Sequence, residues 1–146
     1  MTINDPKAVA DLLRAAEARL FTAAYRKPID LTLDWKNSFA EEAGVYVIFD
    51  KAKPVYIGES ANLRKRMDHM RYTYRHVIRW HLGHDLFSDR PDYRKANGKT
   101  KYSDPIERDL NDAMRKLKIC VMPVPVGRKI VEDYLILKYD PRYNQK

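Results

Sequence analysis

The chain has 146 residues, enough for one ordinary domain. Hydrophobic residues make up 45% of the sequence and charged residues 33%, which supports a core and excludes long disorder, a collagen-like repeat and a disulfide scaffold. The single cysteine, Cys120, cannot form an internal bridge, the first residues lack a signal-peptide pattern, and no apolar run is long enough to span a membrane. We therefore expect a cytoplasmic protein with no membrane partner.

The net charge of +8 is concentrated in the middle of the sequence. Residues 60–101 contain 11 basic and 4 acidic side chains, a net charge of +7, whereas residues 1–59 carry −1 and residues 102–146 carry +2. Aromatic residues are interleaved with these basic ones, which is typical of proteins that bind nucleic acid, because phosphates attract the charges and bases stack on the rings. A solvated helix face followed by an irregular loop would give the same pattern.

The first part of the chain predicts a helix, an extended segment and a hairpin. Asp5 and Pro6 favour a helix start, and apolar residues at helical spacing continue the helix to about residue 25. The alternation from residue 29 to residue 35 predicts a short strand. Two apolar runs, 44–49 and 54–58, then predict a β-hairpin.

The second part predicts mainly helices. Apolar spacing indicates helices over residues 60–74 and 77–82, and a polar segment that contains Pro91 and Asn97-Gly98 predicts a long loop over residues 83–104. A helix over 105–116, a strand over 117–124 and an apolar helix over 127–139 complete the chain. The pattern predicts one α+β domain with an N-terminal helical extension.

The hairpin carries two tyrosines, Tyr46 and Tyr56, whose relative orientation depends on the turn. With a three-residue turn at 51–53, both rings point to the same face of the sheet as diagonal neighbours. A two-residue turn would send them to opposite faces. The sequence has no glycine at the turn that would decide between the two.

Other residues could join these tyrosines in phosphodiester chemistry. Arg66 lies beside the apolar stripe of its helix, with His69 on the same flank, and Glu132 lies in an otherwise apolar helix. A carboxylate can hold a divalent cation, a guanidinium can stabilise a phosphoryl transition state, and a phenol or imidazole can accept a proton from water. Each residue also has an ordinary explanation, as a packed ring, a solvated cation or part of a polar helix face.

The order and spacing of these residues resemble the GIY-YIG nuclease superfamily. The matching segments are Gly44-Val45-Tyr46, Tyr56-Ile57-Gly58, Asn62-Leu63-Arg64-Lys65-Arg66, Glu132 and Tyr139-Asp140-Pro141-Arg142-Tyr143-Asn144. The spacing is 10 residues from the first tyrosine to the second, 10 more to the arginine, and 12 from the glutamate to the asparagine. The resemblance covers residues 43–146, although residues 72–116 match no motif.

The resemblance implies a fold and an activity. The fold is α+β, with a small antiparallel sheet of about three strands flanked by helices; residues 43–146 form the nuclease domain, with a basic insertion at about 72–116, and residues 1–42 pack on it or extend it. The activity is a DNA endonuclease that holds Mg²⁺ or Mn²⁺ on Glu132 and leaves 5′-phosphate and 3′-hydroxyl ends. By analogy, Tyr46 would deprotonate the attacking water directly or through the metal shell. Tyr56 would orient water or phosphate, Arg66 would bind the scissile phosphate and Asn144 would brace the site.

Two features depart from the family pattern. Glu59 follows Tyr-Ile-Gly, where excision-repair members have lysine and homing members a small polar residue; its carboxylate could support the metal, pair with Arg66 or indicate altered chemistry. His69 could also support catalysis. The basic middle segment exceeds the minimal module, so we expect a DNA-binding surface there. The predicted phosphate contacts are Arg64, Lys65, Arg75, Arg79, Arg94, Lys95, Lys99 and Lys101.

One alternative to the enzyme is a catalytically inactive module on the same fold that binds nucleic acid or a protein. The presence of the two tyrosines, the arginine, the glutamate and the asparagine favours an enzyme, and Glu59 is the main feature against it. A symmetric duplex target would require a homodimer, because one active site cuts one strand at a time. Helix 6–25 is a candidate dimer contact, although its apolar face is better explained by packing on its own domain.

Overall fold

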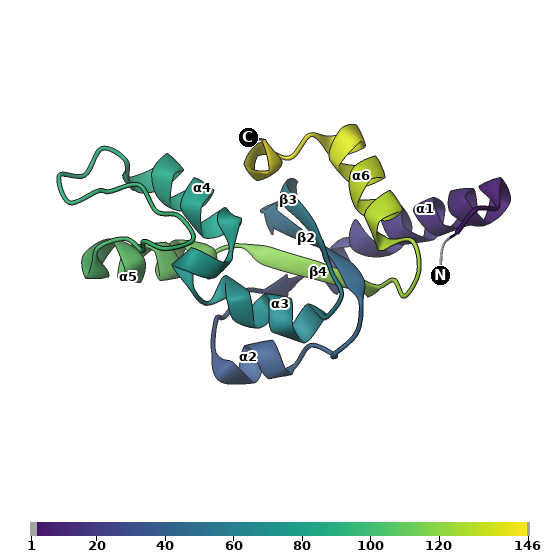
Figure 1. The fold of residues 1–146 in the computed structure, drawn as a ribbon, viewed down its shortest axis with the longest axis horizontal. Coiled ribbons are helices and arrows are strands. Elements are labelled where there is room, and N and C mark those ends of the chain that lie inside the picture. Colours follow the sequence, from purple (N-terminus) through teal and green to yellow (C-terminus); the bar gives the residue numbers. More distant parts are fainter. Residues whose placement is uncertain (1–2, 146) are drawn as a thin grey trace.

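A four-stranded antiparallel sheet forms the centre of the computed structural model, which describes residues 3–145 (Figure 1). Its strand order is β1-β4-β2-β3. The strands are β1 (Lys27–Pro28), β2 (Gly44–Asp50), β3 (Lys53–Ser60) and β4 (Lys118–Pro123). The short β1 adds a fourth strand to the three that were expected, and the predicted α+β class with an antiparallel sheet is confirmed.

Helices cover both faces of this sheet. The α-helices are α1 (Pro6–Leu20), α2 (Leu33–Asn37), α3 (Leu63–Met70), α4 (Val77–Phe87), α5 (Asp104–Met114) and α6 (Arg128–Tyr139). Single 3₁₀ turns are η1 (Ala23–Tyr25), η2 (Thr73–Arg75) and η3 (Arg142–Asn144). Helices α1 and α6 lie on one face and α2 to α5 on the other (Figure 1). None of the helices described here is both long and apolar enough to cross a membrane.

The central strand β2 divides its side chains between two cores. Tyr46 and Ile48 pack with α2 to α5, whereas Val45 and Val47 pack with α1 and α6. Because both faces are covered and both neighbouring strands are paired, residues 44–49 are all buried. This explains why the segment is a continuous apolar run. Ala16 and Leu20 place the end of α1 in the second core, so this helix packs on its own domain.

The β2–β3 hairpin places Tyr46 and Tyr56 on one face of the sheet although its turn has two residues, for which opposite faces were expected. Asp50 pairs with Lys53, so the turn contains two residues and not three. A β-bulge follows, at which Val55 has no partner on β2. The extra residue restores the register, so Tyr46 and Tyr56 lie on the same face, with ring centroids 6.0 Å apart.

Some predicted boundaries were wrong. Residues 33–37 form helix α2 and not a strand: Thr32 Oγ1 accepts a hydrogen bond from the Trp35 amide at 3.1 Å, and Leu33 is exposed. The apolar alternation there therefore reflects the buried Trp35 and not a pleated strand. Helix α1 ends at Leu20, earlier than expected, and α4 continues to Phe87, which shortens the following loop to residues 88–103.

Arg79 is buried in the core, so its predicted role as a phosphate contact was wrong. Its side chain is 1% exposed. The guanidinium donates to Glu107 at 3.0 Å, to Asn111 at 2.7 Å and to Thr73 at 3.0 Å. These contacts join α4, α5 and η2, and because the charge is compensated inside the protein it is not available to DNA.

Replacement of Arg79 by alanine should destabilise the protein by about 3–5 kcal/mol, because Glu107 and Thr73 would lose their partner in a buried network. The matched control is Arg75→Ala, four residues earlier and exposed, which should change the free energy of unfolding by less than about 1 kcal/mol. Urea denaturation followed by circular dichroism measures both. Equal losses for the two variants would contradict the structural role of Arg79.

Candidate active site

The hydroxyl of the fully buried Tyr46 lies between two nitrogen donors. Arg66 Nε, from α3, donates to Tyr46 Oη at 3.2 Å, and His76 Nε2 is 2.8 Å from the same oxygen. His76 Nδ1 accepts a hydrogen bond from the Ile78 amide at 3.1 Å, as the N-cap of α4, so the ring proton is on Nε2. Tyr46 Oη therefore accepts two hydrogen bonds, and its hydroxyl group can donate a hydrogen bond to a third partner.

Tyr56 belongs to the same cluster. Its ring centroid is 5.3 Å from that of His76. Burial raises the pKa of Tyr56, Arg66 opposes this shift, and the carboxylate of Glu132 raises the pKa further. Burial also raises the pKa of Tyr46, again against the effect of Arg66. Both phenols are therefore protonated at neutral pH unless another cation approaches them.

Glu132 lies on α6 beside the outer strand β3. Its side chain is 14% exposed, and Lys129 Nζ is 2.7 Å from Oε1. The carboxylate is therefore largely buried, and its charge raises the pKa of Tyr56. Within residues 3–145, no group of three or more His, Cys, Asp or Glu side chains could enclose a metal ion. A single carboxylate fits Mg²⁺, which commonly binds one or two carboxylates and completes its shell with water and phosphate oxygens.

Asn144, at the end of the η3 turn, is hydrogen-bonded to the outer edge of strand β3. Its Oδ1 accepts from the Ile57 amide and its Nδ2 donates to the Ile57 carbonyl, both at 2.8 Å. The preceding Tyr143 donates to Asp85 Oδ2 at 2.8 Å, which fixes the η3 turn against α4. Both polar atoms of the Asn144 amide are occupied, so this residue braces the strand next to Tyr56.

Two glycines of the family-like motifs allow this packing. Gly58 pairs directly with Tyr46, and a Cβ at Gly58 would lie 2.5 Å from the Tyr46 hydroxyl oxygen. A Cβ at Gly44 would clash with the Met122 carbonyl oxygen and with Leu63. Glycine at these positions therefore lets β2, β3 and α3 approach closely enough to bring the tyrosines and Arg66 together.

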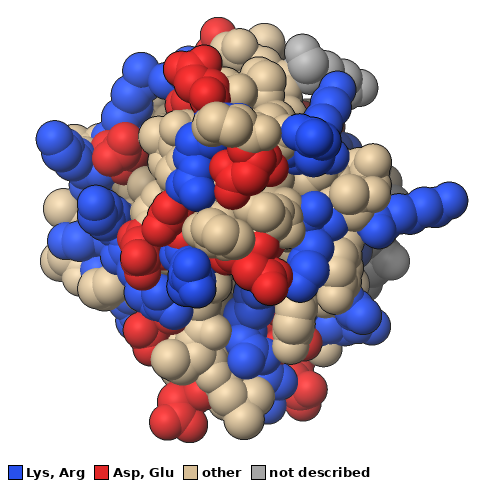
Figure 2. Space-filling model, turned by 90° about the vertical axis from the view of Figure 1, so that its left-hand side faces the viewer, with Lys and Arg blue, Asp and Glu red and all other residues tan. Residues whose placement is uncertain are grey.

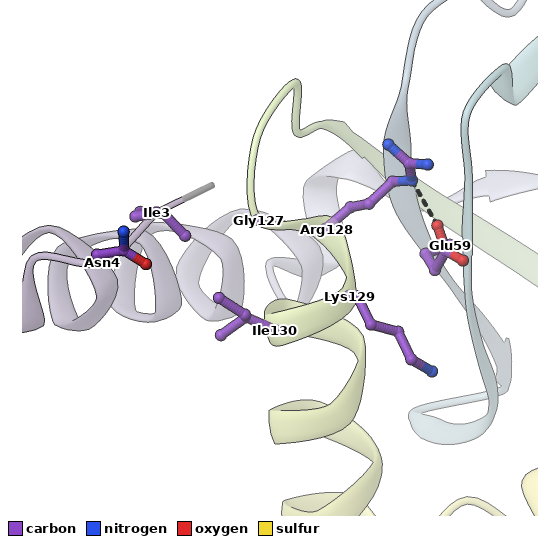
Figure 3. A pocket seen from close by; sticks show the side chains of 7 residues that line it. All are labelled: Ile3, Asn4, Glu59, Gly127, Arg128, Lys129 and Ile130. Atoms are coloured by element: carbon purple, nitrogen blue, oxygen red, sulfur yellow. Dashed lines mark hydrogen bonds and ion pairs between the residues drawn. The ribbon is translucent and has the colours of Figure 1, made fainter. Parts of the chain in front are cut away.

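Glu59 points to the other face of the sheet. It pairs with Val45, which belongs to the core under α1 and α6, and its Oε2 is 2.5 Å from Arg128 Nε (Figure 3). The partner of Glu59 is thus Arg128 and not Arg66. Together with the first turn of α6, the pair lines a cavity of about 440 Å³. Because the Glu59 charge is compensated, it does not face a phosphate uncovered.

The remaining predicted DNA contacts differ in their surroundings. Arg64 is half-buried and donates from Nε to the Phe39 carbonyl at 2.7 Å, whereas Lys65 is exposed. The other five predicted contacts are all exposed: Arg75, Arg94, Lys95, Lys99 and Lys101. Figure 2 shows the end of the molecule formed by α4, α5 and the 88–103 loop, where basic side chains alternate with acidic ones. The surface is therefore not one continuous basic patch.

Sequence reasoning named His69 and missed His76. The ring of His69 is partly exposed and makes no hydrogen bond within residues 3–145, while burial and Arg66 lower its pKa. His76 is buried and contacts both tyrosines. The only signal in the sequence was its place directly before the apolar start of a helix, where a polar cap is expected.

Comparisons with known proteins give weak similarity to one group of solved structures. No family model matches the chain, and no curated protein matches it. The chain is similar to the GIY-YIG N-terminal endonuclease domain of UvrC from Thermotoga maritima. GIY-YIG is also the superfamily that the sequence motifs resemble.

Three crystal structures illustrate the similarity. For a point mutant bound to its catalytic divalent cation, the identity is 20% and the TM-score 0.45, over 77% of this chain and 93% of that one. A second cation-bound point mutant gives 24% and 0.40, over the same shares of the two chains. The magnesium-bound domain gives 21% and 0.40, over 78% of this chain and 100% of that one.

The buried His76 predicts a pH-dependent stability. Burial, Arg66, His69 and Arg79 hold the pKa of His76 well below its usual value of 6.5 in the folded protein. The unfolded chain therefore binds more protons below about pH 6.5, and the free energy of unfolding should fall with decreasing pH by up to about 1.4 kcal/mol per pH unit.

His76→Asn keeps a helix-capping side chain but removes this titration, so its stability should fall less between about pH 7 and pH 5 than that of the wild type. Urea denaturation at several pH values measures the difference. The matched control is His84→Asn, which replaces an exposed histidine of α4 and should retain the wild-type pH dependence. A parallel loss in wild type and His76→Asn would show that His76 does not titrate in this way.

Proposed function

We propose that the protein is a divalent-metal-dependent DNA endonuclease that hydrolyses phosphodiester bonds to 5′-phosphate and 3′-hydroxyl ends. The observation that carries the proposal is the cluster of Tyr46, Tyr56, Arg66 and His76 next to the carboxylate of Glu132. These residues come from separate strands and helices, and the cluster has the groups that phosphodiester hydrolysis requires: a cation ligand, a phosphate-binding fork and a proton acceptor.

Glu132 is the residue that would hold Mg²⁺ or Mn²⁺. Such an ion supplies Lewis-acid stabilisation of the charge on the phosphate and leaving group. The largely buried carboxylate already attracts a cation, because the ammonium of Lys129 lies 2.7 Å away. Lys129 is exposed along its side chain and can turn towards solvent when another cation takes its place.

Arg66 is suited to hold the scissile phosphate. Its Nε is used by Tyr46, which orients the planar guanidinium, while a guanidinium has four further N–H donors on its terminal nitrogens. A phosphate that gains negative charge in the transition state is stabilised by such oriented donors. Tyr56, beside Arg66 in the cluster, would orient the water or a phosphate oxygen.

Tyr46 is the proposed proton acceptor. As the water oxygen attacks phosphorus, its proton passes to the Tyr46 phenolate; the P–O3′ bond breaks and the 3′-oxygen takes a proton from solvent. Arg66 and His76 stabilise the phenolate because both already donate to Oη. Burial raises the pKa of Tyr46, however, so these two donors need the additional positive charge of a metal to produce the phenolate at neutral pH.

The exposed basic residues of the middle segment support DNA as the substrate. Lys95 and Lys99 form no ion pair among residues 3–145, so they are available for phosphates, whereas Lys101 lies 3.5 Å from Asp104.

The proposal includes a cytoplasmic location. For a symmetric duplex target it also includes a homodimer, because the site contains one carboxylate centre that would cut one strand at a time.

Glu132→Gln should abolish Mg²⁺-dependent cleavage of DNA, because the amide removes the charge that holds the cation. The matched control is Asp133→Asn, the neighbouring carboxylate on α6, which is largely exposed and should remain active. Gel assays with plasmid, duplex, branched and single-stranded DNA, with and without Mg²⁺ or Mn²⁺, measure the activity. If the wild type cuts none of these substrates, the chain is a binding module and the proposed activity is wrong.

Tyr46→Phe should lower the cleavage rate by about 10²–10⁴-fold, because it removes the proton acceptor and leaves the Arg66 and His76 donors without their partner. Single-turnover cleavage at saturating protein measures the rate. Tyr25→Phe alters an exposed tyrosine far from the site in sequence and should cut at the wild-type rate. A Tyr46→Phe protein with unchanged single-turnover rate would exclude Tyr46 as the base.

A further inference from the structure

Two adjoining cavities lead from Tyr56 along helix α4. The first has a volume of about 390 Å³ and is lined by Tyr56, Tyr143 and Asn144, together with Trp80 and His81 of α4. The second, of about 250 Å³, is lined by Trp80, His81, His84, Tyr93 and Lys95. Because Trp80 and His81 line both cavities, we describe them together as the α4 groove. One end of the groove is at Tyr56 and the other is at Tyr93 and Lys95 of the 88–103 loop.

The rings of the α4 groove are held in place by hydrogen bonds and by each other. Trp80 Nε1 donates to the Thr73 carbonyl at 2.5 Å, and Tyr93 Oη is 2.9 Å from His84 Nδ1. The rings of His81 and Tyr143 are nearly parallel, at 10°, with centroids 6.4 Å apart. Fixed rings lose little conformational freedom when a flat ligand stacks on them, so the groove is preorganised for a planar aromatic group.

The charged side chains beside the groove are Lys95, which lines the far cavity, and Asp85, which accepts from Tyr143 and pairs with Arg142. Because Arg142 compensates Asp85, the positive charge of Lys95 favours an anionic occupant. Lys99 follows on the same exposed loop. The end of the molecule in Figure 2 nevertheless alternates basic and acidic side chains, which does not suit a long duplex lying flat across it. A planar group that carries a phosphate, which is the composition of a nucleotide, matches both the rings and the lysines.

Paired bases are stacked inside a duplex and cannot enter such a groove, whereas unpaired bases can stack on aromatic side chains. We propose that the α4 groove binds unpaired nucleotides next to the scissile phosphate, with bases on the aromatic rings and a phosphate at Lys95. The substrate is then a forked, flapped or single-stranded DNA and not a continuous duplex. This inference rests on the proposed nuclease function for the position of the scissile phosphate.

Binding without cleavage tests the groove separately from catalysis. Fluorescence anisotropy in EDTA compares a forked DNA with a fully paired duplex of the same length and sequence. The wild type should bind the fork about tenfold or more tightly, and His81→Ala and Lys95→Ala should each reduce this preference. His81→Phe keeps a ring at the position and should restore it. The matched control is Lys118→Ala, which removes a lysine on strand β4, outside the groove, and should keep the preference.

Stacking itself is measured with 2-aminopurine placed in the unpaired arm next to the fork. Its fluorescence should be quenched on binding to the wild type and to Glu132→Gln, and recovered with His81→Ala. Equal affinity for fork and duplex, or unquenched 2-aminopurine in the wild-type complex, would overturn the inference even if the protein cuts DNA. Preferential fork binding and quenching without any cleavage would support the groove and refute the nuclease.

Discussion

The hydrogen bonds of one buried hydroxyl hold the candidate site together. Tyr46 Oη lies in the core, where an unsatisfied oxygen would be costly, and its two donors come from Arg66 on α3 and His76 at the start of α4. The same contacts therefore fix two helices against the sheet and arrange the polar groups for chemistry. Gly58 makes room for the ring on the neighbouring strand, so the hairpin and both helices depend on one another.

The sequence allowed prediction of strands β2, β3 and β4, of all α-helices except α2, and of Tyr46, Tyr56 and Arg66 in the cluster, because apolar spacing and motif spacing encode them. The sequence left the relative orientation of Tyr46 and Tyr56 open, because a three-residue turn would place them on one face and a two-residue turn on opposite faces. The structure has a two-residue turn, and the bulge at Val55 nevertheless places them on one face. A bulge has no short-range signature. Arg79 was wrongly predicted as a phosphate contact, and His76 was not identified as a site residue. The burial of each depends on a partner distant in the chain, Glu107 for Arg79 and Tyr46 for His76.

The first turn of α6 balances charge at the outer edge of the sheet. Arg128 pairs with Glu59, and Lys129 pairs with Glu132 and also with Asp133. Glu59 and Glu132, the two acids near β3, are thus compensated by different cations. In the proposed function, a divalent ion at Glu132 would displace Lys129 and leave the Glu59–Arg128 pair intact, so the two carboxylates would have separate roles.

Burial connects the fold of the site with its dependence on a cation. In a dry environment the phenol of Tyr46 is protonated, since desolvation raises its pKa more than Arg66 lowers it. The same dry environment strengthens the attraction between a phenolate and any nearby positive charge. In the proposed function, Tyr46 would therefore act as a base only after a cation binds beside it. Metal dependence would therefore follow from the burial of Tyr46 as much as from the carboxylate of Glu132.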